Sequence, residues 1–204
     1  MLGKLRDFSN HVSGKLSNIV GGASGRCINI GCGTDVRPFW VNCDLILLEP
    51  SVRKFNIKST SDLGWLREQS ADIIECNHVI GYLNLAQTVN FFCAAHDALK
   101  AGVKFIVEFS CARKVAALMC KVKLRQNYKS EYIEVIRALY AFDTPDAYDA
   151  GFDAQTYIFG WSADFVVHQL GKCGFGEIEI QDPLTHQRRV NRDVGVIASK
   201  LNAS

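Results

Sequence analysis

The feature of this sequence that most constrains its fold is a short apolar run that stops at a pair of glycines. Residues 27–30 form the run, and Gly31-Cys32-Gly33 follows it. A buried parallel strand that ends in a tight turn has this pattern, because glycine lets the backbone bend sharply and lets a ligand approach. The next apolar run ends in Asp44, whose carboxylate can accept two hydrogen bonds from neighbouring hydroxyls, as an acidic residue does for a ribose in nucleotide-binding α/β folds. The two elements together predict a nucleoside-binding site.

The spacing after the glycines separates two classes of nucleoside. A dinucleotide-binding fold has a third glycine where its first helix starts and an acidic residue about 20 positions further on. Here Val36 stands at the third glycine position, and Asp44 follows Gly33 closely through a segment that contains Pro38. Any helix in this segment must be very short, so the spacing disfavours a nicotinamide-dependent dehydrogenase.

Length and composition fit one α/β domain over residues 1–204 with a full hydrophobic core. The chain is 48% hydrophobic and 22% charged, and its net charge of +2 is too mild to predict a nucleic-acid-binding surface. Its eight cysteines include no C-x-x-C pair and no cluster with histidines at metal-ligand spacing, so we expect reduced core cysteines, no metal site and a cytoplasmic location. No signal peptide is apparent, and no apolar run reaches the roughly 18 residues of a membrane span, so we expect a soluble protein.

Two motifs carry a resemblance to a known family. The first is the glycine pair followed by Trp40-Val41-Asn42-Cys43-Asp44, and the second is residues 70–83, which read SADIIECNHVIGYL. They resemble class I S-adenosylmethionine-dependent methyltransferases, most closely the bacterial branch associated with cell-surface glycan synthesis. The resemblance covers about 26–110 and 160–200. It implies an α/β, Rossmann-like fold with a seven-stranded, mostly parallel sheet, helices on both faces and an antiparallel last strand.

The resemblance also implies which residues bind S-adenosylmethionine. Asn56 stands where the family often has an acidic residue for the adenine amino group, and its side-chain carbonyl can still accept a hydrogen bond. Asn77 and His78 follow a strand where the strand order reverses, and ligands of open α/β sheets bind there. Gly81-Tyr82 replaces a Glu-His pair of the family. The implied cofactor contacts are Gly31, Cys32, Gly33, Asp44, Leu45, Asn56 and Asn77.

The implied activity is methyl transfer to a small-molecule acceptor, which we expect to be a saccharide hydroxyl in surface glycan biosynthesis. The sulfonium of the cofactor is a strong electrophile, so the protein mainly has to align donor and acceptor. A hydroxyl acceptor adds the need for a general base. His78 is the first candidate for this base, Tyr82, Tyr157 and His186 are the others, and a structural role for His78 stays open. The competing class is a non-catalytic protein that binds a nucleoside or a partner through the same fold.

Two segments have no counterpart in the resemblance. Residues 1–20 repeat apolar side chains at steps of three and four, which predicts an amphipathic helix. This helix either packs on the domain or covers the cofactor site, or alternatively touches an anionic membrane peripherally. Residues 111–159 predict a helical cap insertion beside the site. Within it, residues 111–140 hold seven basic and two acidic side chains. This basic run is either a solvated helix face or a surface that attracts a phosphate-bearing saccharide. The sequence predicts no particular oligomeric state.

Overall fold

The computed structural model describes residues 26–47, 49–121, 157–185 and 190–202. Its strands are β1 (Cys27–Ile30), β2 (Val41–Asp44), β3 (Arg53–Lys54), β4 (Ala71–Asn77), β5 (Leu99–Ser110), β6 (Phe175–Gln181) and β7 (Asp193–Lys200). Its helices are α2 (Thr60–Arg67), the short 3-10 helix η1 (Ile80–Tyr82), α3 (Leu85–Ala98), α4 (Ala112–Lys121) and α7 (Ala163–Lys172). None of these helices is long and apolar enough to cross a lipid bilayer.

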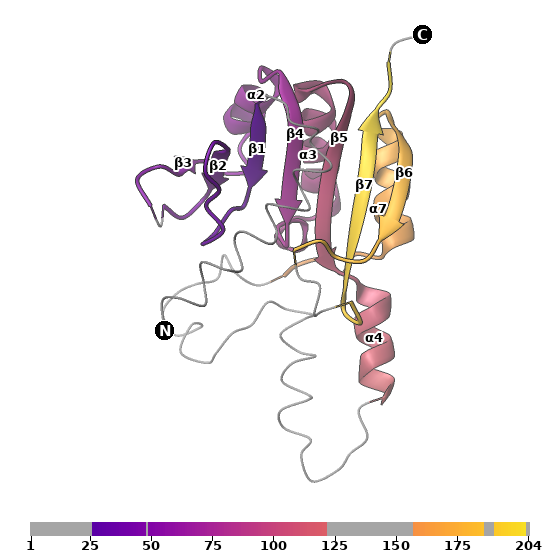
Figure 1. Cartoon of the computed structure of the whole chain (residues 1–204). Helices are drawn as coiled ribbons and strands as arrows, with labels where there is room; N and C mark the ends of the chain where they lie inside the picture. Colours follow the sequence, from indigo (N-terminus) through magenta and orange to yellow (C-terminus); the bar gives the residue numbers. More distant parts are fainter. Residues whose placement is uncertain (1–25, 48, 122–156, 186–189, 203–204) are drawn as a thin grey trace.

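The strands form one sheet in the order β3-β2-β1-β4-β5-β7-β6. β1 to β5 are parallel to one another, whereas β7 runs antiparallel to both β5 and β6. The strand order reverses between β1 and β4, so the carboxyl ends of these two strands form the position where open α/β sheets bind ligands. Figure 1 shows α4 extending beyond this same edge. The predicted α/β, Rossmann-like, seven-stranded and mostly parallel fold is confirmed, including the antiparallel last strand.

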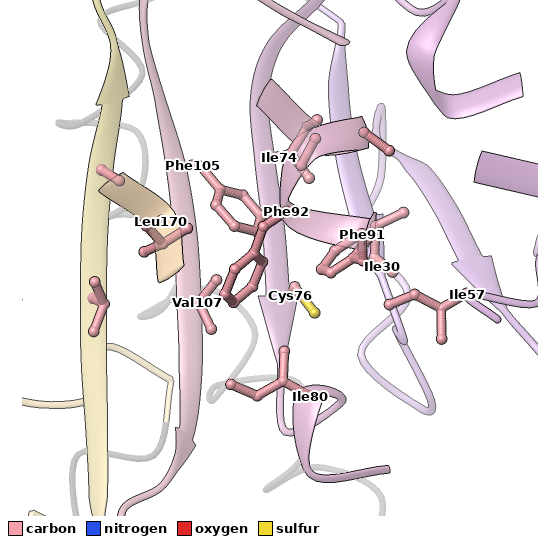
Figure 2. Packing of buried hydrophobic residues seen from close by; sticks show 14 of the residues in the cluster. Ile30, Ile57, Ile74, Cys76, Ile80, Phe91, Phe92, Phe105, Val107 and Leu170 are labelled. Carbon is pink, nitrogen blue, oxygen red and sulfur yellow. The ribbon is translucent and has the colours of Figure 1, made fainter. Parts of the chain in front are cut away.

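The described helices α2, α3 and α7 share one hydrophobic core with one face of the sheet. Figure 2 shows part of this core, in which Phe91 and Phe92 of α3 both pack edge-on against Phe105 of β5 with ring centroids 5.8 Å apart. The opposite face carries a smaller buried cluster, packed against Trp40 and Leu184; its members are Cys27, Ile73, Ile106 and Ile197. The helix predicted over 1–20 lies outside the described residues. Residues 122–156 of the predicted cap lie outside them as well.

A local signal explains where α3 begins, and a contact between distant residues lies beside the start of α7. The side chain of Asn84 accepts the N–H of Gln87 (2.9 Å), and the side chain of Gln87 accepts the N–H of Asn84 (3.0 Å). This capping box satisfies N–H groups that have no partner within the helix. α7 follows Trp161, which is buried and donates its indole N–H to the carbonyl of Ile80 (2.9 Å). Both helices are therefore attached to the segment that leaves the carboxyl end of β4.

Cys93 on α3 and Cys173 at the end of α7 form a disulfide, with Cα atoms 4.9 Å apart. The prediction of reduced cysteines is wrong for this pair, because the packing of the two helices brings together residues 80 positions apart in the chain. The other six cysteines are not part of this disulfide, and of these only Cys120 is exposed. Disulfides are rare in cytosolic proteins. The pair is thus an argument against a cytoplasmic location, which stays a prediction.

Candidate functional site

The turn after β1 is tied to the end of β2. Gly31 and Gly33 have φ values of 71° and 49°, in the left-handed region that favours glycine. The N–H groups of Gly31 and Cys32 both donate to the carbonyl of Cys43 (2.7 and 3.1 Å). A Cβ on Gly31 would lie 2.0 Å from Cγ2 of Val79, whereas a Cβ on Gly33 would have no neighbour within 4 Å. Packing therefore requires the first glycine, and the second leaves its backbone open to a ligand.

The carboxylate of Asp44 lies at this turn, as the sequence predicts. Its Oδ2 accepts the N–H of Gly33 (2.8 Å), and its Oδ1 accepts the N–H of Ile46 (2.9 Å). Each carboxylate oxygen has about two acceptor positions, so both oxygens keep capacity for the hydroxyls of a ligand. Leu45 is apolar and 46% exposed beside it. The structure thus brings Gly33, Asp44 and Leu45 together; we call these three residues the cradle.

Cys32 lies between the two glycines and is buried. Burial, and to a smaller extent the nearby carboxylate of Asp44, raise the pKa of its thiol to about 11. The thiol is therefore protonated at neutral pH, and a protonated thiol is a poor nucleophile. At this position Cys32 contributes a small side chain to the turn rather than a reactive group.

Buried asparagines hold the segment 34–40, which connects β1 to β2 without a helix. Asn42 accepts the N–H of Arg37 (3.0 Å) and donates to the carbonyls of Arg37 (2.9 Å) and Trp40 (3.2 Å). Asn29 donates to the carbonyl of Asp35 (2.9 Å). Within the Trp-x-Asn-x-Asp motif, Asn42 therefore holds the loop in place, whereas Asp44 belongs to the cradle.

Asn77 has an unsatisfied acceptor at the end of β4. The neighbouring Glu75 is fully buried and makes two bonds to the guanidinium of Arg37 (2.6 and 2.9 Å). Burial alone lowers the pKa of Arg37, but its hydrogen bonds to Glu75 and Asp35 outweigh this effect and raise the pKa. Asn77 donates its amide to Glu75 (2.5 Å), while its Oδ1 is buried and has no hydrogen-bond partner among the described residues. Such an oxygen suits a donor group on a ligand.

Asn56 lies where the chain turns into α2. Its Oδ1 accepts the N–H of Lys58 (3.0 Å), and its own N–H donates to Asp62 (2.9 Å). The side-chain carbonyl predicted to contact adenine thus already holds the turn. A carbonyl oxygen has a second acceptor position, so the contact with the cofactor stays a prediction.

His78 faces β5 and β7 rather than continuing the contacts of Asn77. Its Nε2 lies 3.6 Å from Oε1 of Glu108 and 3.5 Å from Oδ2 of Asp193. Both carboxylates are buried, whereas the His78 side chain is 17% exposed. The backbone of His78 has φ 56°, which is uncommon for residues other than glycine. His78, the predicted base, therefore has different contacts from the predicted cofactor residue Asn77 beside it, although both lie at the carboxyl edge of the sheet.

The two acids beside His78 are held by other donors. The N–H and hydroxyl of Thr185 donate to Glu108 (2.9 and 2.5 Å). The hydroxyl of Ser110 (3.0 Å) and the guanidinium of Arg192 (2.6 and 2.7 Å) donate to Asp193. Sequence reasoning missed these residues. One signal was present, since Glu108 is a charged residue inside an apolar run.

The other candidate bases fare differently. Burial raises the pKa of Tyr157 well above its usual range, so its phenol is protonated at neutral pH and is a poor base. Its ring fills the space beside Gly81, where an added Cβ would lie 2.5 Å away, and it packs edge-on to Tyr82. Gly81 therefore leaves the room that the ring of Tyr157 fills. His186 lies outside the described residues. No group of three His, Cys, Asp or Glu in the described part of the chain is arranged to hold a metal ion.

Alanine at the two glycines should separate packing from binding. Each substitution places a side chain at positive φ, at a cost of about 1–2 kcal/mol. Gly31→Ala also collides with Val79, so its unfolding temperature should fall further than that of Gly33→Ala. Gly33→Ala should stay folded but weaken the binding of S-adenosylhomocysteine, because its methyl group occupies the open side of the turn. Thermal unfolding and calorimetric titration measure the two effects, and equal stability of both variants would contradict the packing role of Gly31.

No family model and no curated protein sequence matches this chain. Solved structures resemble it at low identity. An S-adenosylmethionine-dependent methyltransferase from Clostridium acetobutylicum ATCC 824 is 11% identical, with a TM-score of 0.59 over 97% of this chain and 92% of that one. An S-adenosylmethionine-dependent methyltransferase from Archaeoglobus fulgidus is 10% identical, with a TM-score of 0.57 over 94% of this chain and 92% of that one. A possible exported protein from Bordetella parapertussis is 14% identical, with a TM-score of 0.53 over 97% of this chain and 68% of that one. The chain therefore has the fold of class I S-adenosylmethionine-dependent methyltransferases.

Proposed function

We propose that this protein binds S-adenosylmethionine and transfers its methyl group to a small-molecule acceptor. The observation that carries the proposal is the cradle together with Asn77. An open glycine backbone, a carboxylate and a buried, unsatisfied carbonyl oxygen lie at the ends of adjacent parallel strands β1, β2 and β4. When bound, the cofactor supplies an electrophilic methyl group on a sulfonium.

The residues present fit such a cofactor. Asp44 would accept the ribose hydroxyls, and the backbone of Gly33 would allow close approach. The Oδ1 of Asn77 would accept a hydrogen bond from the amino group of the cofactor. Leu45 and Cys32 would line the site with apolar surface. In this arrangement the protein contributes alignment, which is most of what the reaction requires.

For the acceptor, we propose a saccharide hydroxyl in surface glycan synthesis. The support is the resemblance of the sequence motifs, together with the position of His78 at the same edge of the sheet, because a hydroxyl must lose its proton as it is methylated. His78 would take this proton as general base. The glycan role itself depends on the resemblance alone.

A phosphate on the acceptor is a further part of the proposal, and it depends on the basic run in 111–140. The structure describes the side chains of two of these basic residues, and both already have protein partners. Arg113 pairs with Asp164, and Lys114 donates to backbone oxygens of Val190 (2.7 Å) and Asp193 (2.9 Å). The attraction of a phosphate would therefore fall to the basic residues from 121 to 137, whose side chains the structure does not describe.

Two competing functions make different predictions. A dinucleotide enzyme places a pyrophosphate at the start of the helix after the first strand, but residues 31–40 contain no helix. A non-catalytic protein with this fold would bind the nucleoside and leave every acceptor unmodified. The dehydrogenase is thus disfavoured by geometry, and the binding protein is separated from the enzyme by activity.

Calorimetric titration tests the proposal. The protein should bind S-adenosylhomocysteine saturably and should give no heat of binding with NAD or NADP. The nicotinamide cofactors serve as controls for nonspecific nucleotide binding, because they share the adenosine part. Binding of NAD in preference to S-adenosylhomocysteine would exclude methyl transfer as the function of this site.

A further inference from the structure

Two buried carboxylates lie beside the imidazole ring of His78. Glu108 and Asp193 are 1% and 0% exposed, and both lie within 3.6 Å of the same ring nitrogen. Buried carboxylates destabilise a fold unless they are paired and hydrogen-bonded. Here Thr185, Ser110 and Arg192 supply donors to both. The acids are therefore fixed in place independently of the histidine.

The backbone of His78 is held as well. Its N–H donates to the carbonyl of Glu108 (2.7 Å), and its carbonyl accepts the hydroxyl of Tyr157 (3.4 Å). The left-handed backbone, at φ 56°, turns the side chain away from the direction that a continued strand would give it. Residues held in such conformations are typical of functional sites. The main chain and two immobile carboxylates thus constrain the direction of the imidazole.

The chemistry of the two carboxylates decides which nitrogen of the His78 ring carries the proton. An ionised carboxylate only accepts hydrogen bonds, and the contacts of Asp193 with Ser110 and Arg192 are of this kind. Facing two acceptors, Nε2 is favoured in its N–H form. In a neutral imidazole the other nitrogen, Nδ1, then carries the lone pair.

We propose that Glu108 and Asp193 are positioning residues that keep the proton of His78 on Nε2 and so make Nδ1 the proton-accepting atom of the site. This inference rests on the proposed function. As the acceptor oxygen bonds to the methyl carbon, its O–H bond breaks, the proton passes to Nδ1, and the electron pair of the broken carbon–sulfur bond stays on sulfur. The imidazolium that forms lies against two carboxylates, which stabilise its charge.

Nitrogen-15 NMR of the whole protein with ring-labelled histidine tests the proposal without an acceptor. The chain has five histidines, and the signal lost in His78→Asn identifies His78. At a pH where the ring is neutral, Nε2 should show the shift of a protonated nitrogen and Nδ1 that of an unprotonated one. A neutral His78 with its proton on Nδ1 would overturn the proposal, and this measurement needs no variant of the acids.

Variants of the acids give a second measurement. Glu108→Gln and Asp193→Asn keep the shape of each side chain and remove its charge, so each should convert the single tautomer of His78 into a mixture. Asp97→Asn is the matched control, because Asp97 lies 3.8 Å from Nδ1 of His96 but is about half exposed; it should leave the His78 signals unchanged. Folded variants of both acids that keep the wild-type tautomer would show that the carboxylates do not orient the ring.

The same samples separate this proposal from the proposed function. Glu108→Gln and Asp193→Asn should bind S-adenosylhomocysteine with wild-type affinity, because neither acid contacts a cradle residue in the described contacts. If wild-type protein fails to bind S-adenosylhomocysteine, the proposed function fails whatever the tautomer. If it binds and the tautomer is the wrong one, only the role of the two acids is overturned.

Discussion

His78→Asn should lose about 10²–10⁴-fold in the rate of methyl transfer while binding S-adenosylhomocysteine as tightly as the wild type. This loss is the usual contribution of a general base. Asparagine is the suitable replacement because it tolerates the left-handed backbone that His78 adopts at φ 56°, so loss of activity will not reflect backbone strain. Transfer of a radiolabelled methyl group to a panel of free and nucleotide-linked saccharides measures the rate.

The control is His168→Asn, which makes the same change at an exposed position on α7. It should leave both the rate and the affinity unchanged. If His78→Asn methylates an acceptor at close to the wild-type rate, His78 is a structural residue, which is the alternative that the sequence leaves open.

The second large effect is expected at the cofactor. Asp44→Ala should weaken the binding of S-adenosylhomocysteine by more than tenfold, because each hydrogen bond lost from a charged acceptor contributes about 1.5–3 kcal/mol. The carboxylate has two functions in the structure, since it also accepts the N–H groups of Gly33 and Ile46. Asp44→Asn keeps an acceptor oxygen for the turn and removes the charge, so its affinity should fall between those of the alanine variant and the wild type.

Asp35→Ala is the matched control for Asp44. Asp35 belongs to the same loop but is 55% exposed, and its partner Arg37 keeps two bonds to Glu75. Calorimetry should give wild-type affinity for this variant. A folded Asp44→Ala protein with unchanged affinity would remove the ribose assignment and with it the cradle as a cofactor site.

Much of the fold was predictable because its signals are local. The apolar runs of β4 and β5 end in polar residues at the carboxyl edge of the sheet, and the glycine pair places the sharp turn after β1. Gly33 and Asp44 were predictable as neighbours for the same reason, since adjacent parallel strands bring their carboxyl ends together.

The surroundings of His78 were not predictable in this way. Glu108 and Asp193 are far apart in the sequence, and they meet because β7 inserts beside β5 in the register that pairs Ser110 with Asp193. That insertion is a property of the whole sheet, and no short motif encodes it. The contact of Tyr157 with Gly81 and the disulfide between α3 and α7 are similar cases, in which packing joins segments whose separate sequences are ordinary.

The attachments of α4 and of the segment that contains Tyr157 bear on how a protein with this fold can change. The N–H of Ala112, at the start of α4, donates to Trp161 (2.7 Å), and the N–H of Ile158 donates to Gly81 (2.8 Å), whose neighbour Ile80 accepts the indole of Trp161. The chain between these anchors thus leaves and returns at adjoining points of the sheet. Doubling the length of such a connection costs only about 0.6 kcal/mol even if it has no structure of its own. Evolution can therefore replace this connection while the sheet and the cradle stay the same.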